Sequence, residues 1–425
     1  MKKYLEIYEY YKARILDGKL RAGDRLPSIR EAADLHGVSR TTIENAYFAL
    51  QAEGFLLSTE RSGYYVSRKA RRESAPPEPP KDFAGREKPA FDLSSGDADL
   101  QSFDVKLWHR YINSALRQEE RLCSYSEPQG EEDLREAIAG YIRQKRNVIA
   151  DKDQIVIGAG VDTLLDILCV LLPKDKTVSF PDRSFQKGIS RVQNYGFDVH
   201  NRDKVATIIY VSPSHMTRFG DVMPMQRRLE LIDYSAAHGA LVLEDDYDND
   251  FLYASRPTPS LHALATEDNV VYMSSFANVL TPGIRISFMV LPKVLAEQYR
   301  KQVWRFSQTA SKTEQIALCG YIRDGHIGAQ IRKIRRFATA KTRKFYELLR
   351  DNLSFEDCHV SENGLQIRLT VPFTGTKEDF AREGLSVFWE SFDGATARLT
   401  LLPSALPETA FPAALAAFQR VLGQA

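Results

Sequence analysis

Near the amino terminus, apolar and polar residues recur at helical spacing in three successive stretches. The pattern predicts helices over about 5–15, 29–36 and 40–53, separated by turns that contain glycine. Ser28 and Ser39 stand just before the second and third stretches, where a hydroxyl can accept a hydrogen bond from the first helical turn. This spacing predicts a helix-turn-helix.

The next segment, residues 54–68, alternates as a two-stranded ribbon does, with Arg61, Ser62 and Gly63 at its tip. A basic tip of this kind can enter the minor groove of DNA. The start of the third predicted helix carries short polar and basic side chains of the types that reach phosphates and base edges, namely Arg40, Thr41, Thr42 and Asn45. Both features favour a DNA-binding module.

Residues 69–90 contain five prolines, many charges and one large apolar residue, so this segment is expected not to fold alone. A proline-rich chain of some 20 residues, at about 3 Å per residue, spans roughly 60 Å. We therefore predict a fairly stiff linker that is long enough to reach a partner subunit.

From residue 91 onward, short apolar runs rich in β-branched residues alternate with helical stretches. This order predicts a mostly parallel sheet with helices on both faces and ligands at the carboxyl ends of its strands. Gly158, Ala159 and Gly160 precede one of the helical stretches, whose amino end can hold an anion such as a phosphate.

Composition adds a charge asymmetry to this pattern. The chain has 425 residues, 43% hydrophobic and 27% charged, as is ordinary for a globular protein of two or three domains. Residues 1–72 hold 14 Lys plus Arg against 9 Asp plus Glu, or +5, and because the whole chain is +1 the remainder carries −4. The basic part therefore coincides with the predicted helix-turn-helix.

Neither a membrane span nor the apolar core of a signal peptide is visible, so we expect a cytoplasmic protein. The four cysteines, at 123, 169, 319 and 358, are far apart and lack CxxC spacing. We expect neither a disulfide framework nor a metal site from them.

The amino-terminal segments LRAGDRLPSIREAADLHGVSRTTIENAYFALQAEGFL and SGYYV resemble the winged helix of GntR-type transcription regulators over most of residues 4–67. The resemblance implies double-stranded DNA as a partner and places at the DNA surface Arg30, Ser39, Arg40, Thr42 and Gly63. The alternative is a small helical domain that docks on its neighbour.

Four later segments resemble a fold-type I aminotransferase domain, namely YSEPQGEEDLREAIAGYI, SPSHMTRFGDVMP, EDDYDNDF and SSFANVLTPGIR. Its pairing with a GntR winged helix is the layout of the MocR subfamily. The resemblance implies an α/β protein with a winged helix-turn-helix domain at 1–68, the linker at 69–90 and an aminotransferase-like domain at 91–425. That domain would have a mostly parallel large lobe and a small α+β carboxyl-terminal lobe.

By the same resemblance, Asp245 would pair with the pyridine nitrogen of pyridoxal phosphate, and Tyr247 would face its phenolic oxygen. The other implied contacts are Ser275, Arg285 and the amides of Val161 and Asp162 for the phosphate, Phe185 and His215 for the ring, and Arg398 for an effector carboxylate. A homodimer is implied as well, with Tyr125 contributing across its interface.

The chain departs from the family at the residue that bonds to the cofactor, where Asn278 replaces lysine. An amide is neither nucleophilic nor basic enough to replace that lysine, so we assign no catalytic residue and expect only non-covalent pyridoxal phosphate. Ala277, Met216, Arg218 and Phe219 depart from the family nearby. The alternative is that the remaining polar residues now only satisfy each other.

These observations predict a dimeric transcription regulator whose inactive aminotransferase-like domain senses a small effector. The effector would be pyridoxal phosphate, its amino-acid adduct, or another carboxylate ligand held by Arg285 and Arg398. Two alternatives remain open, a residual pyridoxal-phosphate-dependent transaminase or lyase and an effector-independent dimeric repressor.

Overall fold

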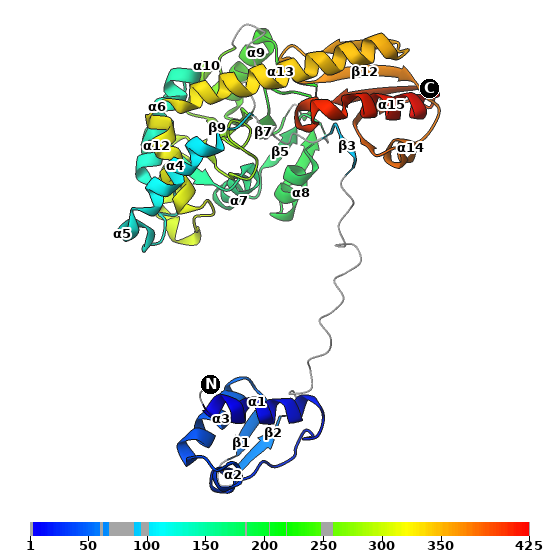
Figure 1. Cartoon of the computed structure of the whole chain (residues 1–425). Helices are drawn as coiled ribbons and strands as arrows, with labels where there is room; N and C mark the ends of the chain where they lie inside the picture. Colours follow the sequence, from blue (N-terminus) through cyan, green and yellow to red (C-terminus); the bar gives the residue numbers. More distant parts are fainter. Residues whose placement is uncertain are drawn as a thin grey trace. The chain divides into compact units, whose positions relative to one another are not determined.

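The structure is a computed structural model that divides into two compact units, residues 1–88 and 89–425 (Figure 1). It describes residues 3–59, 63–67, 89–94, 102–182, 185–203, 205–217, 219–247 and 258–424. Residues 69–88 of the predicted linker, and Arg61 and Ser62 of the predicted tip, lie outside these ranges.

The amino-terminal unit is a three-helix module with a two-stranded wing. Its elements are α1 (Lys3–Leu16), α2 (Ile29–His36), α3 (Arg40–Ala52), β1 (Leu56–Thr59) and β2 (Gly63–Val66). Ser28 and Glu31 form a full capping box at the start of α2, and the Ser39 hydroxyl accepts from the Thr42 amide at the start of α3. The predicted winged helix-turn-helix is confirmed.

The larger unit is built on a seven-stranded sheet with the order β4-β10-β9-β8-β7-β5-β6. The strands are β4 (Ile155–Gly158), β5 (Thr177–Phe180), β6 (Asp198–Asn201), β7 (Ile208–Val211), β8 (Leu241–Asp245), β9 (Val270–Ser275) and β10 (Ser287–Val290). β10 runs antiparallel to both of its neighbours, and the other paired strands are parallel. The predicted, mostly parallel sheet is therefore confirmed.

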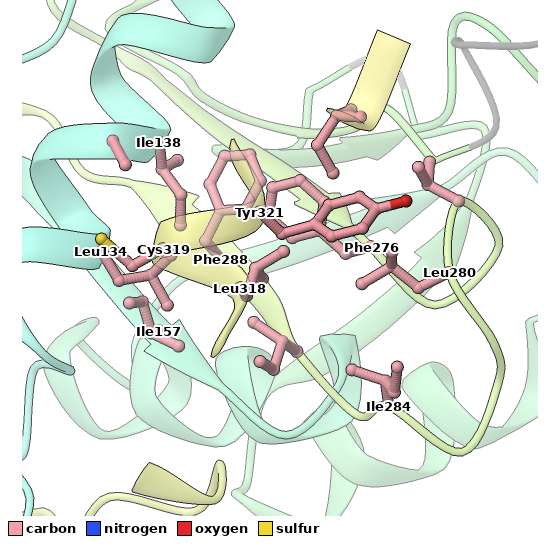
Figure 2. Packing of buried hydrophobic residues seen from close by; sticks show 14 of the residues in the cluster. Leu134, Ile138, Ile157, Phe276, Leu280, Ile284, Phe288, Leu318, Cys319 and Tyr321 are labelled. Carbon is pink, nitrogen blue, oxygen red and sulfur yellow. The ribbon is translucent and has the colours of Figure 1, made fainter. Parts of the chain in front are cut away.

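Helices cover both faces of this sheet. One face packs on α7 (Val161–Leu171), α8 (Gln186–Asn194) and α11 (Lys293–Lys301). The other face packs on α4 (Val105–Leu116), α6 (Glu132–Arg146), α12 (Lys312–Arg323), α9 (Met225–His238) and α10 (Leu261–Leu264). Figure 2 shows part of the hydrophobic core on this second face, where the centroids of the Phe276 and Phe288 rings lie 5.5 Å apart. The short helix α5 (Glu119–Leu122) precedes α6.

The small lobe follows a 27-residue helix, α13 (His326–Asn352). Its antiparallel sheet has the order β11-β12-β15-β14. The elements are β11 (Asp357–Val360), β12 (Ile367–Pro372), β14 (Phe388–Phe392), β15 (Thr396–Leu401), α14 (Lys377–Arg382) and α15 (Phe411–Leu422). A parallel pair of β3 (Phe91–Asp92) and β13 (Leu385–Ser386) ties the start of the unit to this lobe. The predicted α+β lobe is thus confirmed.

Candidate functional site

A cavity of about 1110 Å³ lies at the carboxyl ends of the large sheet's parallel strands, where a parallel sheet is expected to bind its ligands. All nine residues predicted to contact the cofactor line it, namely Val161, Asp162, Phe185, His215, Asp245, Tyr247, Ser275, Asn278 and Arg285. The fold therefore brings together residues that are separated by up to 124 positions in the sequence.

Asp245 is the acidic residue that the end of β8 turns toward the cavity, and only 4% of it is exposed. The Tyr210 hydroxyl, from the neighbouring strand β7, donates to its carboxylate at 2.5 Å. Burial first, and then the charge of Asp245, raise the pKa of Tyr210 well above its ordinary value, so the phenol stays protonated. Tyr210 thus holds the carboxylate in place.

The residues on either side of Asp245 point away from the cavity, because successive side chains of a strand alternate between its faces. Asp246 pairs with Arg146 through two hydrogen bonds, at 2.7 and 3.1 Å, and accepts from Ser214 and Tyr272. This network is structural, and it fixes the strand end that positions Asp245.

Glu244, the residue before Asp245, is likewise buried away from the cavity. Its two carboxylate oxygens accept from the amides of Leu261 and His262, at the start of α10. Burial, and then the neighbouring charge of Asp246, raise the pKa of Glu244 to about 8. Of the three consecutive acids, Asp245 is the one that lines the cavity.

The start of α7 and the residues around it have a geometry suited to an anion. Gly160, with φ of 100°, precedes the helix, and a Cβ added there would lie 2.5 Å from an Nη atom of Arg285. The Arg285 guanidinium therefore sits directly against the helix start, where backbone amides favour negative charge. Ser275 completes the arrangement, since its hydroxyl bonds to Ser287 at 2.9 Å and accepts from the Ala277 amide.

Aromatic rings form another wall. Phe185 stacks on Tyr210 with 5.4 Å between ring centroids, and a side chain at Gly188 would overlap the Phe185 ring. The rings of His215 and Tyr247 also pack against each other, with 4.9 Å between their centroids. These rings form apolar walls suited to a flat heterocycle.

Arg398, which was predicted to bind an effector carboxylate, does not line the cavity. It lies on β15 opposite Thr370, its side chain is exposed, and it is absent from the cavity lining. Its carboxylate-binding role stays a prediction that the geometry of a single subunit does not support.

The sequence did not predict a contact that joins the 213–223 loop of the large lobe to the small lobe. The 213–223 loop lines the cavity with His215, Met216 and Thr217, and then places Phe219 3.8 Å from the Arg368 guanidinium of the small lobe. Arg368 also bonds to Glu390 at 3.0 Å. Phe219 stood out in the sequence only as a departure from the family, and Arg218 lies outside the described residues.

The predicted DNA-facing residues gather on one module. Arg30 on α2 and Arg40, Thr41 and Asn45 on α3 are exposed, whereas the opposite side of α3 is buried through Ile43, Ala46, Tyr47 and Leu50. Ser39 and Thr42 bond to each other through their hydroxyls at 2.8 Å. Gly63 opens β2 with φ of 107° beside the Arg25 guanidinium. Arg30, Arg40, Thr41 and Asn45 therefore present exposed polar groups of the types that bind phosphates and base edges.

Within the described part of the chain, no helix is long and apolar enough to cross a membrane. Among the same residues, no group of three or more His, Cys, Asp or Glu side chains could hold a metal ion. The four cysteines are free thiols, of which Cys169 and Cys319 are buried, Cys358 is half-buried and Cys123 is exposed.

Residues 3–66 match the family of bacterial regulatory proteins called gntR, and residues 88–203 and 198–366 match aminotransferase class I and II. Among similar proteins, the uncharacterized HTH-type transcriptional regulator YhdI of Bacillus subtilis is 31% identical, over 88% of this chain and 84% of that protein. The probable rhizopine catabolism regulatory protein MocR of Rhizobium meliloti is 29% identical, over 92% and 84%.

The HTH-type pyridoxine biosynthesis transcriptional regulator PdxR of Corynebacterium glutamicum is 26% identical, over 78% of this chain and 75% of that protein. Among solved structures, an archaeal alanine:glyoxylate aminotransferase superposes with a TM-score of 0.68 at 18% identity, over 79% of this chain and 91% of that one. At this identity, the superposition shows the fold alone.

Proposed function

The chain belongs to the MocR-type regulators of the gntR family, DNA-binding transcription regulators that carry an aminotransferase-like domain, and we propose that its own such domain is an effector sensor without catalytic activity. We further propose that pyridoxal phosphate, or its amino-acid adduct, binds this domain non-covalently as the effector. The protein would act as a cytoplasmic homodimer.

The observation that carries the proposal is one cavity with a buried carboxylate at Asp245 and an arginine at the start of α7. The residues present fit the cofactor. Arg285, Ser275 and the first turn of α7 would hold the phosphate, and Asp245 would accept from a protonated ring nitrogen. When bound, pyridoxal phosphate supplies an electron-poor ring and an aldehyde. One relative's name also refers to pyridoxine biosynthesis.

Loss of catalysis is supported by the side chains around the cavity. Asn278, which by the sequence resemblance stands at the position of the family's lysine, lines the cavity, and no lysine is among the described residues that line it. An amide can orient a ligand by hydrogen bonds, but it can neither form the covalent bond nor move protons.

Coupling to DNA requires that the effector favour one arrangement of the protein over another. The 213–223 loop is suited to this, because His215 and Met216 line the cavity while Phe219 contacts Arg368 in the small lobe. A ligand that moves the loop would therefore move the lobe. We propose that this shift changes how the two winged helices of the dimer are presented.

Titration of the intact protein with pyridoxal phosphate is expected to show saturable binding and a rise in melting temperature, without a covalent mass increase after borohydride reduction.

Asp245→Asn is expected to raise Kd about ten- to hundredfold, because an amide loses the charge-assisted bond to the ring nitrogen. It should spare the fold, because the amide oxygen can still accept from Tyr210. Asn278→Lys should bond covalently to pyridoxal phosphate, which borohydride reduction would fix and mass spectrometry would detect as a mass increase.

Two outcomes would contradict this proposal. No binding by the wild-type protein would mean that the cavity serves another ligand or none, as in an effector-independent repressor. Turnover of any amino acid in a panel, with added cofactor, would make a residual enzyme the better interpretation.

A further inference from the structure

The cavity continues well beyond the predicted cofactor contacts. Drug-sized ligands occupy pockets of about 300–1,000 Å³, so 1110 Å³ leaves room beside one pyridine ring and its phosphate. The additional space, here called the α9 compartment, lies between strands β5 to β7 and α9. Its lining includes Arg202, Asp203, Ile209, Leu231 and Tyr234.

The α9 compartment has an apolar floor and a charged rim. Ile209 and Leu231 are only partly buried and pack against the core beneath α9. Leu231 and Tyr234 share one face of α9 with Arg227 and Glu230, because these four positions are three or four residues apart. A ligand here would therefore lay an apolar body on the floor.

Arg202 is unusual in both its backbone and its charge. Its φ is 52°, and among the described residues the other non-glycine residue with positive φ is Asn147, which ends a helix. A left-handed arginine is strained, and such strain is typical of ligand-binding positions. The Arg202 Nε donates to the Pro181 carbonyl at 2.9 Å, which fixes the guanidinium at the cavity.

The guanidinium of Arg202 forms no ion pair with any carboxylate in the described ranges, in contrast to Arg227, which pairs with Glu230 at 3.2 Å. Asp203 on the same rim already accepts from the Val205 amide at 2.9 Å. Arg202 is thus a fixed, accessible cation whose Nη groups can meet an anion in two-pronged geometry.

We propose that Arg202 binds the carboxylate of an elongated ligand whose apolar body lies in the α9 compartment. β8, which ends at Asp245, and β6, which precedes Arg202, are three strand spacings apart, or about 14 Å at about 4.8 Å each. The carboxylate belongs either to a long-chain adduct of pyridoxal phosphate or to an organic acid bound beside it. The first source rests on the proposed function, and the second does not.

The test uses two reduced phosphopyridoxyl adducts, of 8-aminooctanoate and of octylamine, which differ only in the terminal carboxylate. Their affinities for the intact wild-type protein are measured by calorimetry, as are those of pyridoxamine phosphate and octanoate. The variants are Arg202→Gln and, as a matched control, Arg227→Gln. Arg202→Gly adds a stability readout, because glycine accepts a positive φ without strain.

The wild-type protein and Arg227→Gln are expected to bind the 8-aminooctanoate adduct about tenfold more tightly than the octylamine adduct, and Arg202→Gln is expected to bind both adducts equally. Arg202→Gly should also lose the preference, while its melting temperature stays unchanged or rises. If the acid is a separate ligand, the adducts bind alike and octanoate itself binds in an Arg202-dependent way.

The inference is overturned if neither the adduct preference nor octanoate binding depends on Arg202. If pyridoxamine phosphate and both adducts fail to bind while octanoate binds through Arg202, the inference stands and the proposed cofactor site fails. If nothing binds, both fail.

Discussion

Replacing Arg30 and Arg40 together by alanine is expected to weaken binding to the DNA upstream of the protein's own gene by about a hundredfold. Both side chains are exposed on α2 and α3, and Arg40 opens the helix that would enter the major groove. Removing one arginine that binds a phosphate or base edge costs about 1–3 kcal/mol. A cost of about 1.4 kcal/mol for each, toward the low end of that range, weakens binding about tenfold per substitution and about a hundredfold for the pair.

Fluorescence anisotropy at several salt concentrations measures this effect. The slope of log K against log salt should flatten by about one for each arginine that binds a phosphate in the wild-type complex. The control is Arg14→Ala with Lys19→Ala, which removes the same charge outside α2 and α3. Equal weakening in both pairs would show that net charge alone, and not docking through α2 and α3, supplies the affinity.

Replacing Asp246 by alanine is expected to lower the free energy of unfolding of the larger unit by about 3–5 kcal/mol. The substitution removes the carboxylate that pairs with the guanidinium of Arg146, whose side chain is only 11% exposed. The hydroxyls of Ser214 and Tyr272 lose their acceptor too. A buried charge without its partner is among the most costly single changes.

Urea denaturation followed by circular dichroism measures this loss, with Asp245→Asn as the matched control. That variant should cost less than about 1 kcal/mol, because Tyr210 can still donate to the amide. Asp246→Ala therefore tests a contribution to stability, whereas Asp245→Asn tests a contribution to ligand binding. Equal destabilisation would contradict the assignment of Asp246 to the structural network and of Asp245 to the cavity.

The winged helix was predictable because its signals are local. Ser28 and Ser39 mark the starts of α2 and α3, and both caps are present. The cavity was predictable for a different reason, since Asp245 and Ser275 end strands of a parallel sheet and therefore meet at one edge. In both cases, the signals lie within short segments, each of which can be interpreted without knowledge of the packing.

Other parts depend on packing that no short stretch reveals. Phe219 and Arg368 meet across two lobes although 149 positions separate them. Alternation along β15 buries Ala397 and Leu399, which turns Arg398 to the opposite face, but the sequence does not say which face meets the cavity. The left-handed backbone of Arg202 is likewise set by its surroundings, since arginine does not favour it.

In the function proposed here, a ligand in the aminotransferase-like cavity controls DNA binding. The affinity of the intact protein for the DNA upstream of its own gene is therefore measured at increasing pyridoxal phosphate concentration, for the wild type and Asp245→Asn. We expect a saturable change in Kd of at least about fivefold, the low end of typical coupling between sites, which Asp245→Asn shifts to higher ligand concentration. An unchanged DNA affinity at ligand concentrations that saturate the cavity would contradict this function.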